Sequence, residues 1–123
     1  MRVLVLEDEY MIAKGLSLIL EAHGASVVGP FASVAEAREA AAREPIDGAF
    51  LDLNLGGIPS FDIADTLRAR DIPVCFLTGY ATRPVPARLT DQRRLAKPFS
   101  ASEIAGELAR FGADRSRPEA RHG

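Results

Sequence analysis

The chain alternates short apolar runs with segments in which apolar residues recur at helical spacing. Most of the runs are apolar throughout, as expected of strands that helices cover on both faces. The predicted strands span residues 3–6, 26–28, 49–51, 74–77 and 94–96. Strands that alternate with helices favour right-handed β-α-β units. The pattern therefore predicts an α/β fold with a doubly wound, five-stranded parallel sheet in the order 2-1-3-4-5, numbered along the chain.

The helical segments have one apolar face and recognisable ends. Ile12, Leu16 and Ile19 fall on one face of the first helix. The Ser-x-x-Glu sequences at residues 33–36 and 100–103 match the capping box of helix N-termini. They predict where the second and the last helix begin.

The segment after the fourth strand is a poor helix former. Pro84 and Pro86 lack an N–H group, and each disfavours helical backbone in the residue before it. Only residues 87–92 remain, too few for a helix that is stable without packing. We predict a short or irregular fourth helix that is mobile in the resting protein. A fixed proline-rich loop is the alternative.

Length and composition indicate one folded domain. The chain has 123 residues, of which 47% are apolar, enough for a single core. We expect this domain over residues 1–111, with Gly112 ending the last helix. The polar residues 112–123 are expected to form a disordered tail.

Charge and cysteine content exclude several classes of protein. The net charge of −2 and the lack of a basic patch argue against nucleic-acid binding. Cys75 is the only cysteine, so neither an internal disulfide nor a cysteine metal site is possible. No apolar run is long enough to cross a membrane, and the acidic N-terminus is no signal peptide. We therefore expect a cytoplasmic protein without a membrane or nucleic-acid partner.

Polar side chains stand at the carboxyl ends of four predicted strands. Glu7 and Asp8 follow the first, Asp52 ends the third, Thr78 the fourth, and Lys97 follows the fifth. Ligands of doubly wound sheets bind at this edge. We therefore expect these side chains to share one pocket.

This set of groups suits phosphoryl transfer. Three carboxylates and a backbone carbonyl, that of Asn54, are hard oxygen ligands of the kind that Mg²⁺ takes. A carboxylate can also accept a phosphoryl group covalently. Asp52, at the end of the central strand, is the predicted acceptor. Lys97 and the Thr78 hydroxyl would neutralise charge on the transferred group.

Ordinary structural roles are also open to these residues. Asp8 could cap the first helix, and Lys97 with Pro98 could form a simple turn. Four strand ends that supply complementary groups together favour the site over these alternatives. For Met11 and Leu18, ordinary helix packing is the favoured role.

Four short stretches resemble loops of the response-regulator receiver domain of two-component signalling. They are VLVLEDE, LDLNLGG, LTG and KPF. They match its acidic pair, phosphoacceptor loop, hydroxyl loop and lysine loop, and the likeness covers residues 2 to about 111. The resemblance implies a flavodoxin-like receiver fold and phosphorylation of Asp52 by a histidine kinase or histidine phosphotransferase. Such a domain is not an enzyme, although Thr78 and Lys97 assist its phosphorylation and dephosphorylation. The implied Mg²⁺ ligands are Glu7, Asp8, Asp52 and the carbonyl of Asn54.

The sequence departs from the usual receiver pattern in two ways. Arg94 occupies the position where family members commonly carry Tyr or Phe, and the segment between Thr78 and Lys97 is short. With FLTGY, these features resemble the FAT GUY subgroup, which is associated with HWE-type histidine kinases. Tyr80 of this motif is expected to lie over the site entrance.

The resemblance also implies surfaces for partners. No effector domain follows, so we expect a stand-alone receiver that binds an unknown downstream protein. The expected output face combines the irregular fourth helix, the fifth strand and the last helix. Kinase docking is expected on the first helix and the loop before the last one. The first-helix residues expected to contact the kinase are Glu9, Ala13, Ser17 and Leu18.

Two other functions are weighed against this one. Residues 52–54 faintly resemble the nucleophile loop of haloacid-dehalogenase hydrolases, so a small aspartyl-phosphate hydrolase is the main alternative. The chain has no cap domain and little room for a substrate pocket, which disfavours it. A phosphate-independent docking protein of the same fold is disfavoured because the acceptor, hydroxyl and lysine are all present.

Overall fold

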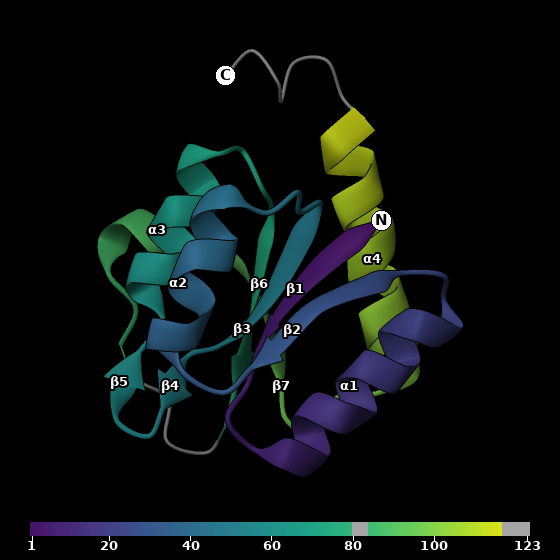
Figure 1. Cartoon of the computed structure of the whole chain (residues 1–123), viewed down its shortest axis with the longest axis horizontal. Coiled ribbons are helices and arrows are strands. Elements are labelled where there is room, and N and C mark those ends of the chain that lie inside the picture. The colour runs from purple at the N-terminus through teal and green to yellow at the C-terminus, as the bar shows by residue number, and fades with distance from the viewer. Residues whose placement is uncertain (80–83, 117–123) are drawn as a thin grey trace.

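The computed structural model describes residues 1–79 and 84–116, which form the elements labelled in Figure 1. The strands are β1 (Arg2–Leu6), β2 (Ser26–Phe31), β3 (Gly48–Asp52), β4 (Asn54–Leu55), β5 (Ile58–Pro59), β6 (Val74–Thr78) and β7 (Arg93–Ala96). The helices are α1 (Tyr10–Ala22), α2 (Val34–Arg43), α3 (Phe61–Ala69), the 3₁₀ turn η1 (Ala87–Leu89) and α4 (Ala101–Ser116). No helix of the described residues has the length and apolar character needed to span a membrane.

Five strands form one parallel sheet in the order β2-β1-β3-β6-β7. This order confirms the predicted 2-1-3-4-5 arrangement of a flavodoxin-like receiver fold, because β4 and β5 lie outside the main sheet. Helices α1 and α4 cover one face and α2 and α3 the other (Figure 1). The carboxyl ends of the strands therefore meet at one edge, which is the lower edge in Figure 1.

The central strand β3 is buried along its whole length because both of its faces are covered. Phe50 points toward α4, where its ring lies 5.2 Å from that of Phe111 between centroids. Leu51 points the opposite way, into the core beneath α2 and α3. This two-sided burial explains why the run reads as continuously apolar up to Asp52.

A bulge in the edge strand β2 supports the end of β1. The pairing of β1 with β2 shifts register between Leu4 and Leu6, and Gly29 adopts a φ of 105°. A side chain at Gly29 would collide with the backbone of Phe31, so this turn requires glycine. Beyond the bulge, the Phe31 carbonyl accepts a hydrogen bond from the N–H of Glu7 at 2.9 Å. The backbone of Glu7 is thereby fixed to the sheet.

The last helix begins as predicted and ends later. Ser100 and Glu103 form both bonds of the capping box, at 3.0 and 2.9 Å. The predicted end at Gly112 is wrong, because α4 continues to Ser116. Phe111 is buried against the sheet and stabilises helical backbone around that glycine. The predicted tail is thus helical over residues 112–116, and its remainder lies outside the described residues.

The predicted irregular fourth helix is confirmed as the single 3₁₀ turn η1. Leu89 anchors the turn because its side chain is fully buried in the core. The Arg88 guanidinium also makes a two-pronged contact with Asp65 of α3, with N–O distances of 3.0 and 2.9 Å. The mobility of this segment in the resting protein stays a prediction.

We predict that Gly48→Ala lowers the free energy of unfolding by about 1–3 kcal/mol. An added Cβ at Gly48 would overlap the ring of Phe111, so α4 would have to shift away from β3. Urea unfolding at equilibrium measures the change. The matched control is Gly106→Ala, since Gly106 lies in α4 with open space around it. This control should raise stability by up to about 1 kcal/mol, and a neutral Gly48→Ala would contradict the packing argument.

Candidate functional site

Three carboxylates gather at the carboxyl ends of β1 and β3. The two strands are neighbours, so Glu7 after β1 and Asp52 at the end of β3 lie side by side. Glu7 is 2% exposed and Asp52 5%, whereas Asp8 is exposed to solvent. One oxygen of each carboxylate lies within 4.8 Å of the others. The structure therefore brings together the three predicted acidic residues.

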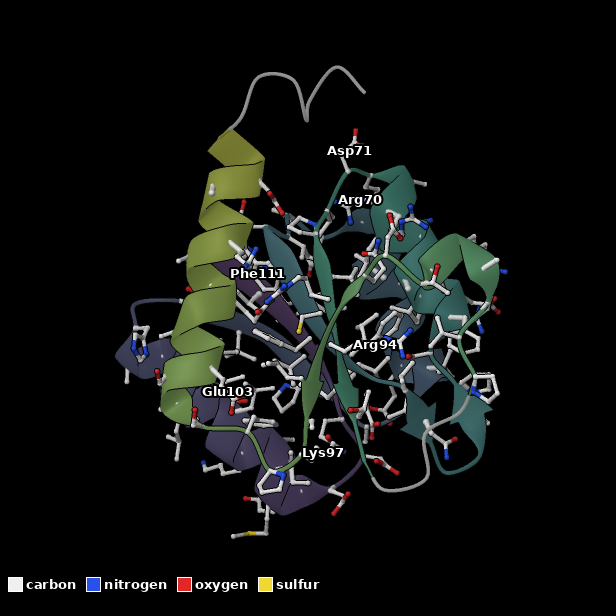
Figure 2. The ribbon with its side chains drawn as sticks, turned by 180° about the vertical axis from the view of Figure 1, so that it is seen from behind. Arg70, Asp71, Arg94, Lys97, Glu103 and Phe111 are labelled. Carbon is white, nitrogen blue, oxygen red and sulfur yellow. The ribbon has the colours of Figure 1, made fainter. Side chains whose placement is uncertain are left out.

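Lys97 lies in the loop after β7 (Figure 2), and its ammonium group contacts this cluster. Its Nζ lies 2.6 Å from Glu7 Oε1 and 3.2 Å from Asp52 Oδ2. It also lies 3.7 Å from Oε1 of Glu9, a contact that the sequence analysis missed. The Lys97 side chain is only 12% exposed, so these charges interact largely away from water. Lys97 is thus more than a turn residue.

Burial and this ion pair shift two pKa values. Burial raises the pKa of Glu7 to about 7, although the hydrogen bonds from Lys97 and the Glu9 N–H oppose the rise. The nearby charge of Asp52 raises it further. Burial alone would lower the pKa of Lys97, but the contacts with Glu7 and Asp52 outweigh it and raise that pKa. Glu7 therefore ionises near pH 7 while it contacts the Lys97 ammonium.

The loop after Asp52 is held by a short antiparallel ribbon, β4–β5, which the sequence analysis did not predict. The N–H of Asn54 donates to Asp52 Oδ1 at 3.2 Å. Gly56 and Gly57 form the two-residue turn of the ribbon, with φ values of 60° and 92°. Such a turn requires positive φ at both positions, which glycine accepts without strain. The Gly-Gly pair was therefore a sequence signal for the ribbon.

Thr78 ends the strand next to that of Asp52, but its hydroxyl is directed toward β7. Thr78 ends β6, and its Oγ1 donates to the carbonyl of Leu95 on β7 at 3.4 Å. This bond is long, so it holds the hydroxyl weakly. Gly79 follows, and its Cα position has open space around it. Tyr80, which was predicted to cover the entrance, lies outside the described residues.

The structure does not support the alternative role of Asp8 as a cap of the first helix. The N-cap position of α1 is Glu9, which makes no side-chain capping bond. Two corrections concern Met11 and Leu18, predicted to pack against neighbours. Their side chains are 77% and 55% exposed, because they lie on the face of α1 turned away from the sheet. Apolar spacing alone did not distinguish that face from the covered one.

Two residues predicted to dock a kinase are buried instead. Ala13 is 4% and Ser17 8% exposed, and the Ser17 hydroxyl donates to the Ala13 carbonyl at 2.8 Å. A cavity of about 730 Å³ nonetheless opens between α1 and the loop after β7. Its lining joins Asp52 and Lys97 to the apolar side of α1 and to Phe99. The acidic site is therefore continuous with an apolar groove.

Comparison with known proteins places this geometry in a family. The sequence profile of the response regulator receiver domain matches residues 3–109. The chain belongs to the response regulator receiver domain family. Receiver domains act in two-component signal transduction, generally as phosphoacceptors and not as enzymes, and typically bind Mg²⁺ at an acidic pocket. Such a domain works with a histidine kinase or another phosphotransfer partner.

Several relatives of this receiver domain are known. It is 31% identical over 116 residues to the phyllosphere-induced regulator PhyR of Methylorubrum extorquens, covering 87% of this chain and 42% of that protein. The solution structure of SdrG from Sphingomonas melonis Fr1 is 40% identical, with a TM-score of 0.79 and coverage of 89% and 94%. The PhyR receiver domain of Erythrobacter litoralis is 26% identical, with a TM-score of 0.76 and coverage of 95% and 93%. The chain spans about half the length of the curated relatives it matches.

We predict that, in a metal chelator, the free energy of unfolding falls as pH rises from 4.5 to about 7, through the raised pKa of Glu7. Between these values the folded chain keeps a proton that the unfolded chain has released. The stabilisation is full below 4.5, where Glu7 is protonated in both states, and is lost above about 7, where it is ionised in both. Glu7→Gln should remove this slope in urea unfolding. If the free energy of unfolding changed with pH in the same way in both proteins, the raised pKa would not belong to Glu7.

Proposed function

We propose that Asp52 accepts a phosphoryl group from a phosphohistidine of a partner kinase or phosphotransferase, with the help of Mg²⁺. The observation that carries this proposal is the Lys97 ammonium between two buried carboxylates, at 2.6 Å from Glu7 and 3.2 Å from Asp52. Buried like charges at neighbouring strand ends destabilise a fold. They are retained at functional sites where their reactivity is used.

The residues present fit a magnesium ion. Three carboxylate oxygens within 4.8 Å are hard ligands, and the exposed Asp8 leaves the cluster open to water, which Mg²⁺ retains among its ligands. The proposed ligands are Glu7, Asp8, Asp52 and the carbonyl of Asn54. Bound there, Mg²⁺ would neutralise carboxylate and phosphoryl charge.

The proposed transfer uses the side chains already at this edge. An oxygen of Asp52 attacks phosphorus and forms an O–P bond as the bond from phosphorus to the donor nitrogen breaks. The Lys97 ammonium moves its hydrogen bond from Asp52 to an oxygen of the transferred group. The Thr78 hydroxyl leaves the Leu95 carbonyl, to which it is weakly bonded at 3.4 Å, and donates to another phosphoryl oxygen. Both groups spread the charge of the phosphoryl oxygens.

The exposed apolar side chains of α1 support docking of the histidine partner beside the site. Tyr10, Met11 and Leu18 are 74%, 77% and 55% exposed. The apolar groove next to Asp52 is continuous with this helix through Met11, which lines it. An amphipathic helix of a kinase would bury these side chains and bring its histidine to the acceptor. We also propose that the kinase is of the HWE type and that this chain belongs to the FAT GUY subgroup. The proposed output surface combines η1, β7 and α4.

We predict one phosphoryl group per chain on treatment with acetyl phosphate and Mg²⁺, and none on Asp52→Asn. Intact-mass spectrometry counts the added groups. The matched control is Asp62→Asn, an exposed acidic residue in the first turn of α3, which should still take one group. An adduct that persists in Asp52→Asn would overturn the acceptor assignment. Fast multiple turnover of the donor would instead indicate a phosphatase.

We predict that Asp8→Asn weakens Mg²⁺ binding at least tenfold and slows phosphorylation by acetyl phosphate in parallel. The loss of one carboxylate from the cluster of three removes a charged ligand, and affinity for hard cations depends on the number of charged ligands. Titration of amide signals by NMR measures affinity, and intact mass against time measures the rate. A normal rate at low Mg²⁺ would refute the metal-binding role of Asp8.

A further inference from the structure

Glu9 stands at a helix position to which its side chain is poorly suited. It is the N-cap of α1, where Ser, Thr, Asp and Asn are preferred because their short side chains bond the first helical N–H groups. Glu9 makes no such bond. Its carboxylate turns instead toward Lys97, with Oε1 lying 3.7 Å from Nζ. A residue that breaks a local rule and contacts a functional cation is a candidate for a role in the site.

The contacts of Lys97 divide into two kinds. Glu7 and Asp52 lie at 2.6 and 3.2 Å and belong to the acidic cluster that can hold a metal ion. Glu9 lies outside that cluster and its side chain is 65% exposed. A divalent cation on the cluster would occupy oxygens that now face Lys97 and would repel its ammonium. Glu9 is then the carboxylate that still attracts Lys97.

We propose that Glu9 is a positioning residue that keeps the Lys97 ammonium beside Asp52 when a divalent cation occupies the acidic cluster. This inference rests on the proposed phosphoacceptor function and adds a regulator of the same site. The Glu9 carboxylate lies outside the cluster of three carboxylates and contacts Lys97, so we expect this side chain to act through Lys97. Its backbone N–H also donates to Glu7 Oε2 at 3.1 Å, which fixes where its side chain starts.

The first test measures the side chain of Lys97 by NMR in MgCl₂, without phosphoryl transfer. In the wild-type chain a restrained Lys97 should show two distinct Hε signals, which Lys97→Arg identifies by their loss. Glu9→Gln should merge them, and Glu9→Asp should restore part of the separation. The matched control is Glu21→Gln, an exposed acidic residue on the same helix, which should leave the signals separate. If the two Hε signals of Lys97 were as well separated in Glu9→Gln as in the wild-type chain, the proposal would be overturned.

The second test is a double-mutant cycle on the rate of phosphorylation by acetyl phosphate at saturating donor and Mg²⁺. Glu9→Gln should slow the wild-type chain about threefold, the size expected from losing one half-exposed ion pair. It should have no effect in a Lys97→Met background, because the two act through one contact. An equal effect in both backgrounds would mean that Glu9 acts on the donor's charge, and the proposal would fail. If the wild-type chain takes no phosphate, the proposed function fails and the NMR test still decides the role of Glu9.

Discussion

Two buried carboxylates at the ends of adjacent strands repel each other, and the site depends on the cation that lies between them. Glu7 and Asp52 are almost fully buried, and the ammonium of Lys97 contacts both. Charge repulsion and desolvation would otherwise cost several kcal/mol, or force a carboxylate to keep its proton. The raised pKa of Glu7 shows that this compensation is incomplete. Desolvation of the Glu7 carboxylate thus outweighs the attraction of the Lys97 ammonium.

The sheet order makes this arrangement possible from residues far apart in the sequence. Glu7 and Asp52 follow neighbouring strands, but Lys97 follows β7, which is separated from β3 by β6. Its long side chain reaches across the end of β6, beside Thr78. The bulge of β2 holds the backbone of Glu7 from the other side through the carbonyl of Phe31. Edge strands on both sides therefore hold Glu7 and Asp52 in place, and Asp52 is the proposed acceptor.

Much of this fold could be predicted because parallel sheets demand apolar strands and place their carboxyl ends together. That rule located Asp52 and its partners from strand ends alone. It could not orient side chains, because a rotamer depends on neighbours that only the folded chain supplies. The bond of Thr78 to Leu95 and the turn of Glu9 toward its cation are therefore details of the structure. Exposed Met11 escaped prediction for a related reason: apolar spacing defines a helical stripe but not which of two stripes is covered.

The position of Arg94 constrains how a change at Asp52 can reach the surface. Side chains alternate along β7, and Arg93 is tied to buried Glu107 of α4 at 2.9 Å, so Arg94 points to the opposite face (Figure 2). Drawing the Thr78 hydroxyl away would release the carbonyl of Leu95, the next residue of β7. The ion pair holds one face of the strand against α4, whereas the face of Arg94 is exposed. The output side of β7 thus carries a charged side chain in place of an aromatic one, and its backbone contact with Thr78 is the link to the site that the structure shows.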